Sequence, residues 1–268
     1  MLVATVLRPE QREDGELEVV RLALEQLLDT TELPVGQPEG AVERLFGDPR
    51  QGFESSDGAG WEPYRSPMRV IRKSSEAAVV AEFLRAELDS PRYGERIREL
   101  LYEARLDVSM LIEPGLEDPE ANERRARILE EHRAWLRREG LFNGFPEDVA
   151  WSLVGLAPDE VLSILYIDWD WWLDLSGGTR RPLDAAARIR DGAVPGADAD
   201  SDELIAARLR SDDPPPALIV ASTPELSRLV LVEGHARLTA YALFPEYLPD
   251  ELGVYLGTSE DMGRWVQF

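Results

Sequence analysis

The segment around Gly234 constrains the fold more than any other part of the chain. Leu229 to Val232 is a short, continuous apolar run with two β-branched residues, which predicts a buried strand. Gly234 breaks this pattern, and from Ala236 onwards the apolar residues recur at helical spacing until Pro245 ends the helix. The sequence therefore predicts a strand, a tight glycine turn and a helix.

This glycine turn is a candidate anion site. The first N–H groups of a helix are unpaired and lie at the positive end of its dipole, and a glycine lets a ligand approach the backbone closely. His235 and Arg237 can both be cationic there, which costs about 0.3–1 kcal/mol each unless an anion lies between them. The alternative is an ordinary strand–turn–helix whose polar side chains face water. The candidate phosphate-binding residues are Gly234, His235, Ala236, Arg237 and, one turn further along, Thr239.

A second informative segment, residues 166–172, is rich in tryptophan and aspartate. Read as a strand, it places Asp168 and Asp170 on one face and Trp169 and Trp171 on the other. Two carboxylates on one face are candidate catalytic groups or Mg²⁺ ligands, and the alternative is that they face solvent. We expect the two tryptophans to be buried between the halves of the chain, because large aromatic side chains mostly serve cores.

A loop of small residues, 176–180, follows the tryptophan-rich segment. A pair of glycines beside hydroxyl groups and an arginine can cradle an anion, although the lysine of a Walker loop is missing. Ser176, Thr179 and Arg180 are therefore further candidate anion-binding residues.

The order of predicted elements from about residue 160 to residue 268 resembles the ParB/sulfiredoxin superfamily. The matching features are a helix at 203–210, a proline-led strand at 216–221, a hairpin turn, the strand at 229–233, the Gly-x-x-Arg turn at 234–237, a helix, and a last strand at 252–256. The resemblance implies that this turn contacts nucleotide phosphates. It also implies that the loop at 176–180 lies across the cleft from the turn.

The resemblance leaves the activity open. Sulfiredoxins carry a cysteine in this turn, and this chain has no cysteine, so sulfinic-acid reduction is excluded. Free serine kinases of the superfamily use a nucleotide and a catalytic glutamate, a role for which Asp168, Asp170 and Glu233 are candidates. One function left open is a small-molecule phosphotransferase or nucleotide hydrolase that uses a nucleoside triphosphate with Mg²⁺. The others are a non-catalytic nucleotide-sensing or protein-interaction module and a ParB-like nuclease.

The composition limits the kinds of partner and site that the chain can have. The chain has 29 basic and 52 acidic residues, and a net charge of −23 opposes binding to nucleic acid. With two histidines and no cysteine, it has no disulfide, no thiolate nucleophile and no His- or Cys-rich zinc site. It has neither a run of about 18 apolar residues nor a signal-peptide pattern. We expect a cytoplasmic bacterial protein with no membrane partner, which binds a nucleotide or another phosphorylated small molecule.

The predicted fold class is α+β, with a small mixed sheet in the last of three parts. These are an N-terminal helix and long loop (1–67), a helical region (68–159) and a ParB/sulfiredoxin-like domain (160–268). The helix at 119–139 is expected to end at Gly140 and to carry His132 half-exposed. The other elements expected are a strand at 68–71 and helices at 76–88, 93–104, 147–154 (with Trp151 buried), 159–165 and 182–190.

Overall fold

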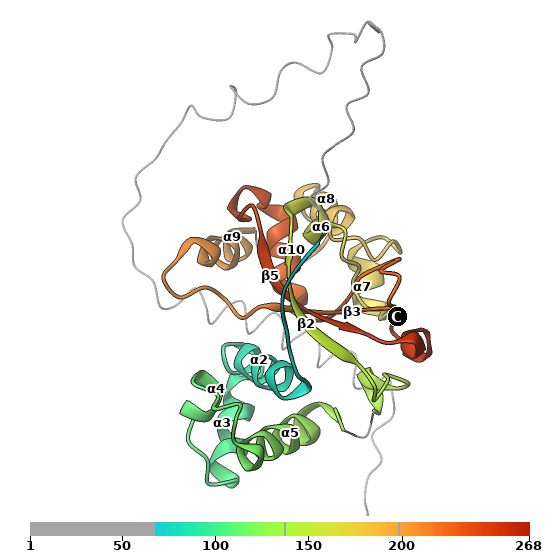
Figure 1. The fold of residues 1–268 in the computed structure, drawn as a ribbon. Helices are drawn as coiled ribbons and strands as arrows, with labels where there is room; N and C mark the ends of the chain where they lie inside the picture. Colours follow the sequence, from blue (N-terminus) through green and yellow to red (C-terminus); the bar gives the residue numbers. More distant parts are fainter. Residues whose placement is uncertain (1–67, 137, 198) are drawn as a thin grey trace, which may run out of the picture.

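A five-stranded mixed sheet lies between two layers of helices in the computed structural model of the chain (Figure 1). The structure describes residues 68–136, 138–197 and 199–268, so the helix and loop expected within residues 1–67 lie outside it. The strand order is β1-β2-β5-β3-β4, in which β3 and β5 are parallel and all other neighbours are antiparallel. The strands are β1 (Arg69–Lys73), β2 (Ala150–Leu156), β3 (Leu218–Ser222), β4 (Val230–Glu233) and β5 (Leu252–Thr258).

One face of the sheet is covered by the helices that follow β1 (Figure 1). Side chains alternate along each strand, so Ile219, Val230 and Tyr255 point to this face and pack against Phe83 and Leu84. This layer consists of α2 (Glu76–Leu88), α3 (Gly94–Glu103), α4 (Ser109–Ile112) and α5 (Pro119–Arg133), followed by the 3₁₀ turn η3 (Gly140–Phe142).

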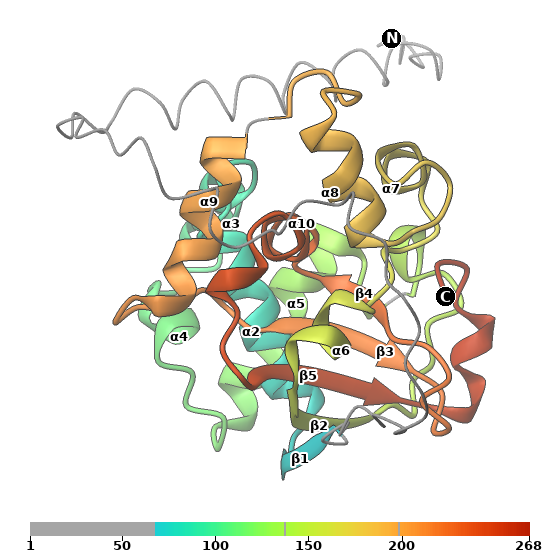
Figure 2. The ribbon, with the colours of Figure 1, turned by 90° about the horizontal axis from the view of Figure 1, so that it is seen from above.

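The opposite face of the sheet packs against α10, which lies between α8 and α9 (Figure 2). Leu218, Val220 and Leu231 point to this side and pack against Leu238 and Tyr241 of α10. The elements of this layer are α6 (Pro158–Leu162), α7 (Asp170–Leu175), α8 (Pro182–Arg190), α9 (Ala199–Ala207), η4 (Arg208–Arg210) and α10 (His235–Leu243); η5 (Pro245–Tyr247) precedes β5 and η6 (Glu260–Arg264) follows it.

The mixed sheet expected for an α+β fold is confirmed, but two elements differ in type from the expectation. The helix expected at 147–154 is wrong, because this segment is β2, which pairs with β1 on one side and with β5 on the other. Trp151 is buried as expected. The strand expected at 166–172 is also wrong. Only Leu165 bridges to β4, and the chain then enters α7, where Trp172 and Leu175 reach the core at helical spacing.

The end of α5 also differs from the expectation. The helix stops at Arg133 because Ala134 adopts a left-handed conformation with φ of 56°, and the fully buried Trp135 then turns into the core. Gly140 begins η3 and does not end the long helix. The side chain of His132 is only 6% exposed, so the half-exposed position expected for it is wrong as well.

Candidate functional site

The glycine turn links the C-terminal end of β4 to the first residue of α10, as predicted. Gly234 has φ of +108°, and a Cβ placed on it would lie 2.5 Å from Cδ2 of Leu218 on β3. Both facts require glycine at this position. No side chain caps α10, so its first N–H groups have no partner from within the helix and are open to an acceptor.

Arg237 lies in the first turn of α10 and is already bound to the fold. One terminal nitrogen, Nη1, donates to the carbonyl oxygen of Pro216, and Nη2 donates to Oε1 of Glu233 at 3.0 Å. The side chain is 11% exposed and that of Glu233 is 21% exposed. Arg237 therefore holds the end of β4 to the segment before β3, while its guanidinium stays beside the uncapped helix end.

His235 is partly buried, and its surroundings favour the neutral ring over the cationic form considered for it. Its ring stacks on Trp172, with 4.7 Å between the centroids, and its Nε2 atom is buried without a hydrogen-bond partner. Burial, together with the charges of Arg133 and Arg237, lowers the pKa of His235 to about 3. The hydroxyl of Thr239 donates to the carbonyl of His235 and also shares a hydrogen bond with the Tyr166 hydroxyl.

The helical layer holds a second group of polar side chains that acts electrostatically on this turn and that the sequence did not predict. Arg133 of α5 donates from Nε, at 2.9 Å, and from Nη2 to Oε1 of Glu87 on α2. His132 places Nε2 3.6 Å from the same oxygen. A signal was present in the sequence, because Glu87 continues the apolar spacing of Val80 and Phe83 and so falls on the buried face of its helix.

The carboxylates of the buried Glu87 and the partly buried Glu233 have opposite pKa shifts. Burial, reinforced by Glu87, raises the pKa of Glu233 to about 7 against the opposing effects of Arg237 and Arg133. Burial also acts to raise the pKa of Glu87, but the contacts with His132 and Arg133 outweigh it and keep that pKa below its ordinary value. Such a separation of two carboxylates is typical of acid–base sites.

The side chains of the loop at 176–180 make hydrogen bonds to the backbone, including that of Trp172. The hydroxyl of Ser176 donates to the carbonyl of Trp172 at 2.7 Å, and that of Thr179 donates to the carbonyl of Ser176. The side chain of Arg180 donates to three backbone carbonyls, those of Tyr166, Gln267 and Phe268. The three nitrogens of its guanidinium thus tie the loop to the C-terminal residues.

Asp168 and Asp170 do not share a strand face, because the chain bends at Asp168 and Asp170 begins α7; both side chains are exposed. Across the described ranges, no three or more His, Cys, Asp or Glu residues form a group suited to a metal ion. Trp169 is 48% exposed and Trp171 is 39% exposed. The expected burial of these two tryptophans is therefore wrong, and the partly buried Trp172 packs against the core instead.

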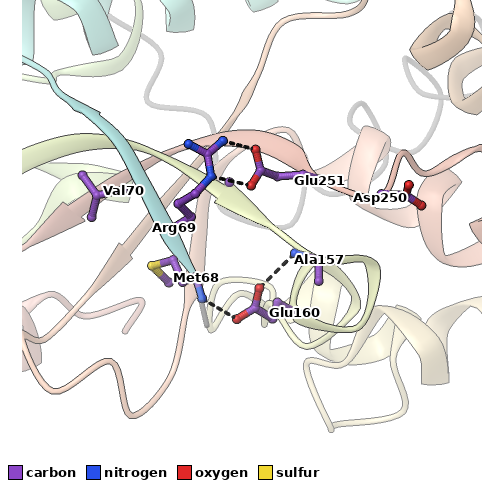
Figure 3. A pocket seen from close by; sticks show the side chains of 8 residues that line it. Met68, Arg69, Val70, Ala157, Glu160, Asp250 and Glu251 are labelled. Atoms are coloured by element: carbon purple, nitrogen blue, oxygen red, sulfur yellow. Dashed lines mark hydrogen bonds and ion pairs between the residues drawn. The ribbon is translucent and has the colours of Figure 1, made fainter. Parts of the chain in front are cut away.

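A cavity of about 530 Å³ lies away from the glycine turn, beside β1 (Figure 3). Three of its four charged side chains, those of Arg69, Glu160 and Glu251, bind each other or the backbone. Arg69 pairs with Glu251, and Glu160 accepts hydrogen bonds from the backbone N–H groups of Met68 and Ala157. This pairing makes the cavity a weaker candidate than the cluster at the turn. The lining residues are Met68, Arg69, Val70, Gly155, Ala157, Glu160, Asp250 and Glu251.

Comparison of the chain with protein-family models, curated proteins and solved structures finds no match. Within the part of the chain that the structure describes, no helix has the length and apolar character needed to cross a membrane. The function is therefore argued from the residues of the site and their geometry.

Proposed function

We propose that this chain binds a nucleotide or another phosphorylated small molecule at the first turn of α10 and transfers or hydrolyses a phosphoryl group there. The observation that carries the proposal is the meeting of three features at Gly234: an uncapped helix N-terminus, the Arg237 guanidinium and the Glu233 carboxyl, whose pKa is about 7. The resemblance to the ParB/sulfiredoxin superfamily assigns phosphate contacts to the same turn.

Binding of the anion uses the backbone and one arginine. The N–H groups of His235, Ala236 and Arg237 supply donors at the positive end of the helix, and a guanidinium can hold two phosphate oxygens at once. Protonation of Glu233 removes the negative charge that competes with the anion for Arg237. The site therefore accepts a phosphate most readily when Glu233 is neutral.

Glu233 is the candidate general base. A base works best when its pKa lies near the working pH, and among the three carboxylates considered Glu233 alone contacts Arg237. In the proposed step, a hydroxyl of the acceptor or of water gives its proton to the ionised form of Glu233, which is present near neutral pH, as its oxygen bonds to the terminal phosphorus. The bond from that phosphorus to the leaving oxygen breaks, and the shortened nucleotide departs. We assign no part of this step to a protein-held metal, and any Mg²⁺ would arrive with the phosphates.

A non-catalytic module is the second candidate function. It is favoured by the contacts of Arg237 and Arg180 with backbone carbonyls, which are typical of residues that hold a fold. The exposed Trp169 and Trp171 also favour it, since tryptophan is enriched in protein interfaces. A nuclease is the third candidate, and the net charge of −23 opposes it.

A thermal-shift panel of nucleotides, with and without Mg²⁺, tests the proposal on the wild type, on Arg237→Gln and on a control. The control is Arg264→Gln, because Arg264 is 75% exposed and pairs with Asp261 on the surface. We expect nucleotide stabilisation in the wild type and the control, and an affinity about ten- to a hundredfold weaker in Arg237→Gln. Turnover of the bound nucleotide supports the enzyme, and binding without turnover supports the module. Equal stabilisation of all three proteins would contradict the proposed site.

A further inference from the structure

Two tryptophans and three carboxylates are exposed together on α7 and the two residues before it. Trp169 is 48% exposed and Trp171 is 39% exposed. Asp168, Asp170 and Asp174 are exposed as well. We call these five residues the Trp–Asp surface. Large aromatic side chains that lie next to each other in solvent are typical of an interaction surface.

The geometry of α7 keeps this surface on the solvent side of the fold. Trp172 and Leu175 are three residues apart and pack towards the core, so the other side of the helix faces outwards. Asp170 and Asp174 are four residues apart and lie one above the other on that outer side, with Trp171 next to them. α7 lies at the outer edge of its layer (Figure 2). The core contacts of the helix therefore hold the Trp–Asp surface in a fixed orientation.

The negative charge of this surface is not balanced by nearby cations. Within the described ranges, neither the Asp170 nor the Asp174 carboxylate makes an ion pair or a hydrogen bond. Arg180 and Arg188, which flank this segment, donate to backbone carbonyls instead. Like charges four residues apart on a helix repel each other. A positively charged partner would remove this repulsion.

We infer that the Trp–Asp surface is a docking surface for an arginine-rich segment of a partner protein. The guanidinium groups of such a segment can stack on the rings of Trp169 and Trp171, because the face of a tryptophan ring attracts cations. They can also pair with the carboxylates of Asp170 and Asp174. Arginine suits this surface better than lysine, because its planar guanidinium both stacks on a ring and holds a carboxylate with two nitrogens.

The charge of the whole chain selects the same kind of occupant. A net charge of −23 steers a basic partner towards the surface. It also disfavours a second copy of this chain as the occupant, because each copy carries the same net charge. The inference is independent of the phosphate site at Gly234, and it holds whether or not that site is catalytic.

Fluorescence anisotropy of a short labelled peptide of alternating arginine and glycine tests the inference at about 0.15 M salt. The variants are Trp169→Ala/Trp171→Ala and Asp170→Asn/Asp174→Asn. We expect saturable binding to the wild type, with an affinity about five- to thirtyfold weaker in the tryptophan variant and about three- to tenfold weaker in the aspartate variant. The same peptide with lysine in place of arginine should bind the wild type several-fold more weakly.

The controls match the variants in chemistry but lie on other elements. Glu246→Gln/Asp250→Asn removes the same charge from two exposed carboxylates that are also four residues apart. Tyr102→Ala removes an aromatic ring that is 85% exposed. Both controls should change the affinity by less than about twofold.

A wild type that does not bind the arginine peptide, or a tryptophan variant that binds it as tightly as the wild type, would overturn the inference. An equal loss of affinity in Glu246→Gln/Asp250→Asn, or equal affinities for the arginine and lysine peptides, would overturn it too, because net charge alone would then explain the binding. If the alanine variant does not fold, Trp169→Leu/Trp171→Leu keeps apolar side chains without the rings and should weaken binding similarly. Arg237→Gln should keep its peptide binding, so a failure of this inference leaves the proposed function untouched.

Discussion

Glu233 and His235 stand on either side of Gly234, and burial shifts their pKa values in opposite directions. It raises the pKa of Glu233 to about 7 and lowers that of His235 to about 3. Both shifts favour the neutral form of the side chain. Arg237 is then the dominant charge of the turn at mildly acidic pH, which suits an anion site.

The two shifts predict opposite dependences of stability on pH. Glu233 holds its proton more tightly when folded, so stability falls as pH rises from its ordinary pKa of 4.5 to about 7. His235 contributes stability that is present above its ordinary pKa of 6.5 and is lost as pH falls towards 3. We therefore expect the melting temperature of Glu233→Gln, relative to wild type, to rise between pH 5 and pH 7, as read by calorimetry. The exposed control Glu246→Gln should show no such trend, and a constant difference for Glu233→Gln would contradict the shift.

Replacing Gly234 by alanine is predicted to destabilise the fold more than replacing Gly178, although both glycines have a positive φ. Gly178 has φ of +87° with nothing within 4 Å of an added Cβ, so Gly178→Ala should lose about 1–2 kcal/mol from the backbone alone. Gly234→Ala adds the clash with Leu218 and should lose a further 1–3 kcal/mol or so. Urea unfolding measures the stability of both variants. An equal loss of unfolding free energy in the two would show that the close approach of Gly234 to β3 does not affect stability.

At the scale of elements, the sequence predicted those whose signal is local. The strand before Gly234, the turn and α10 follow from an apolar run, a glycine and helical spacing, and all are confirmed. β2 was misread because its residues are buried on both faces, which removes the alternation that marks a strand. α7 was misread because alternating Asp and Trp imitate a strand, while the residues that reach the core are Trp172 and Leu175.

The burial of α7 predicts which of its tryptophans stabilises the fold. Trp172 is partly buried, packs against the core and stacks on Tyr166 and His235, so Trp172→Ala should lower the unfolding free energy by about 3 kcal/mol. Trp169→Ala and Trp171→Ala should each lower it by less than about 1 kcal/mol, because both side chains are largely exposed. Denaturant unfolding midpoints measure these changes. A loss of stability in Trp169→Ala as large as in Trp172→Ala would show that the exposed face of α7 is covered in solution.

At the scale of the whole molecule, the site depends on contacts that no local pattern encodes. Glu87 and Arg133 come from segments far from Glu233 in the chain, and they act on it electrostatically because the helical layer packs on the sheet. The sequence therefore predicted the site residues that lie on the turn between β4 and α10. The contribution of the helical layer became visible only in the folded chain.

The overall charge predicts how the protein responds to nucleic acid. A net charge of −23 repels a phosphate backbone, and a local anion site at Arg237 does not compensate for it over a duplex. We expect no binding to a short DNA duplex at about 0.15 M salt by fluorescence anisotropy. Low-micromolar binding under these conditions would revive the nuclease.

The central claim is that an anion binds at the first turn of α10, and an NMR titration of the backbone amides with pyrophosphate tests it most directly. The first turn of α8 is an internal control, since that helix has the same length as α10 and also lacks a side-chain cap. The account predicts that the amide signals of His235, Ala236 and Arg237 shift saturably with one dissociation constant while those at the start of α8 stay in place. Unmoved signals at His235 to Arg237, or equal shifts at both helices, would contradict it.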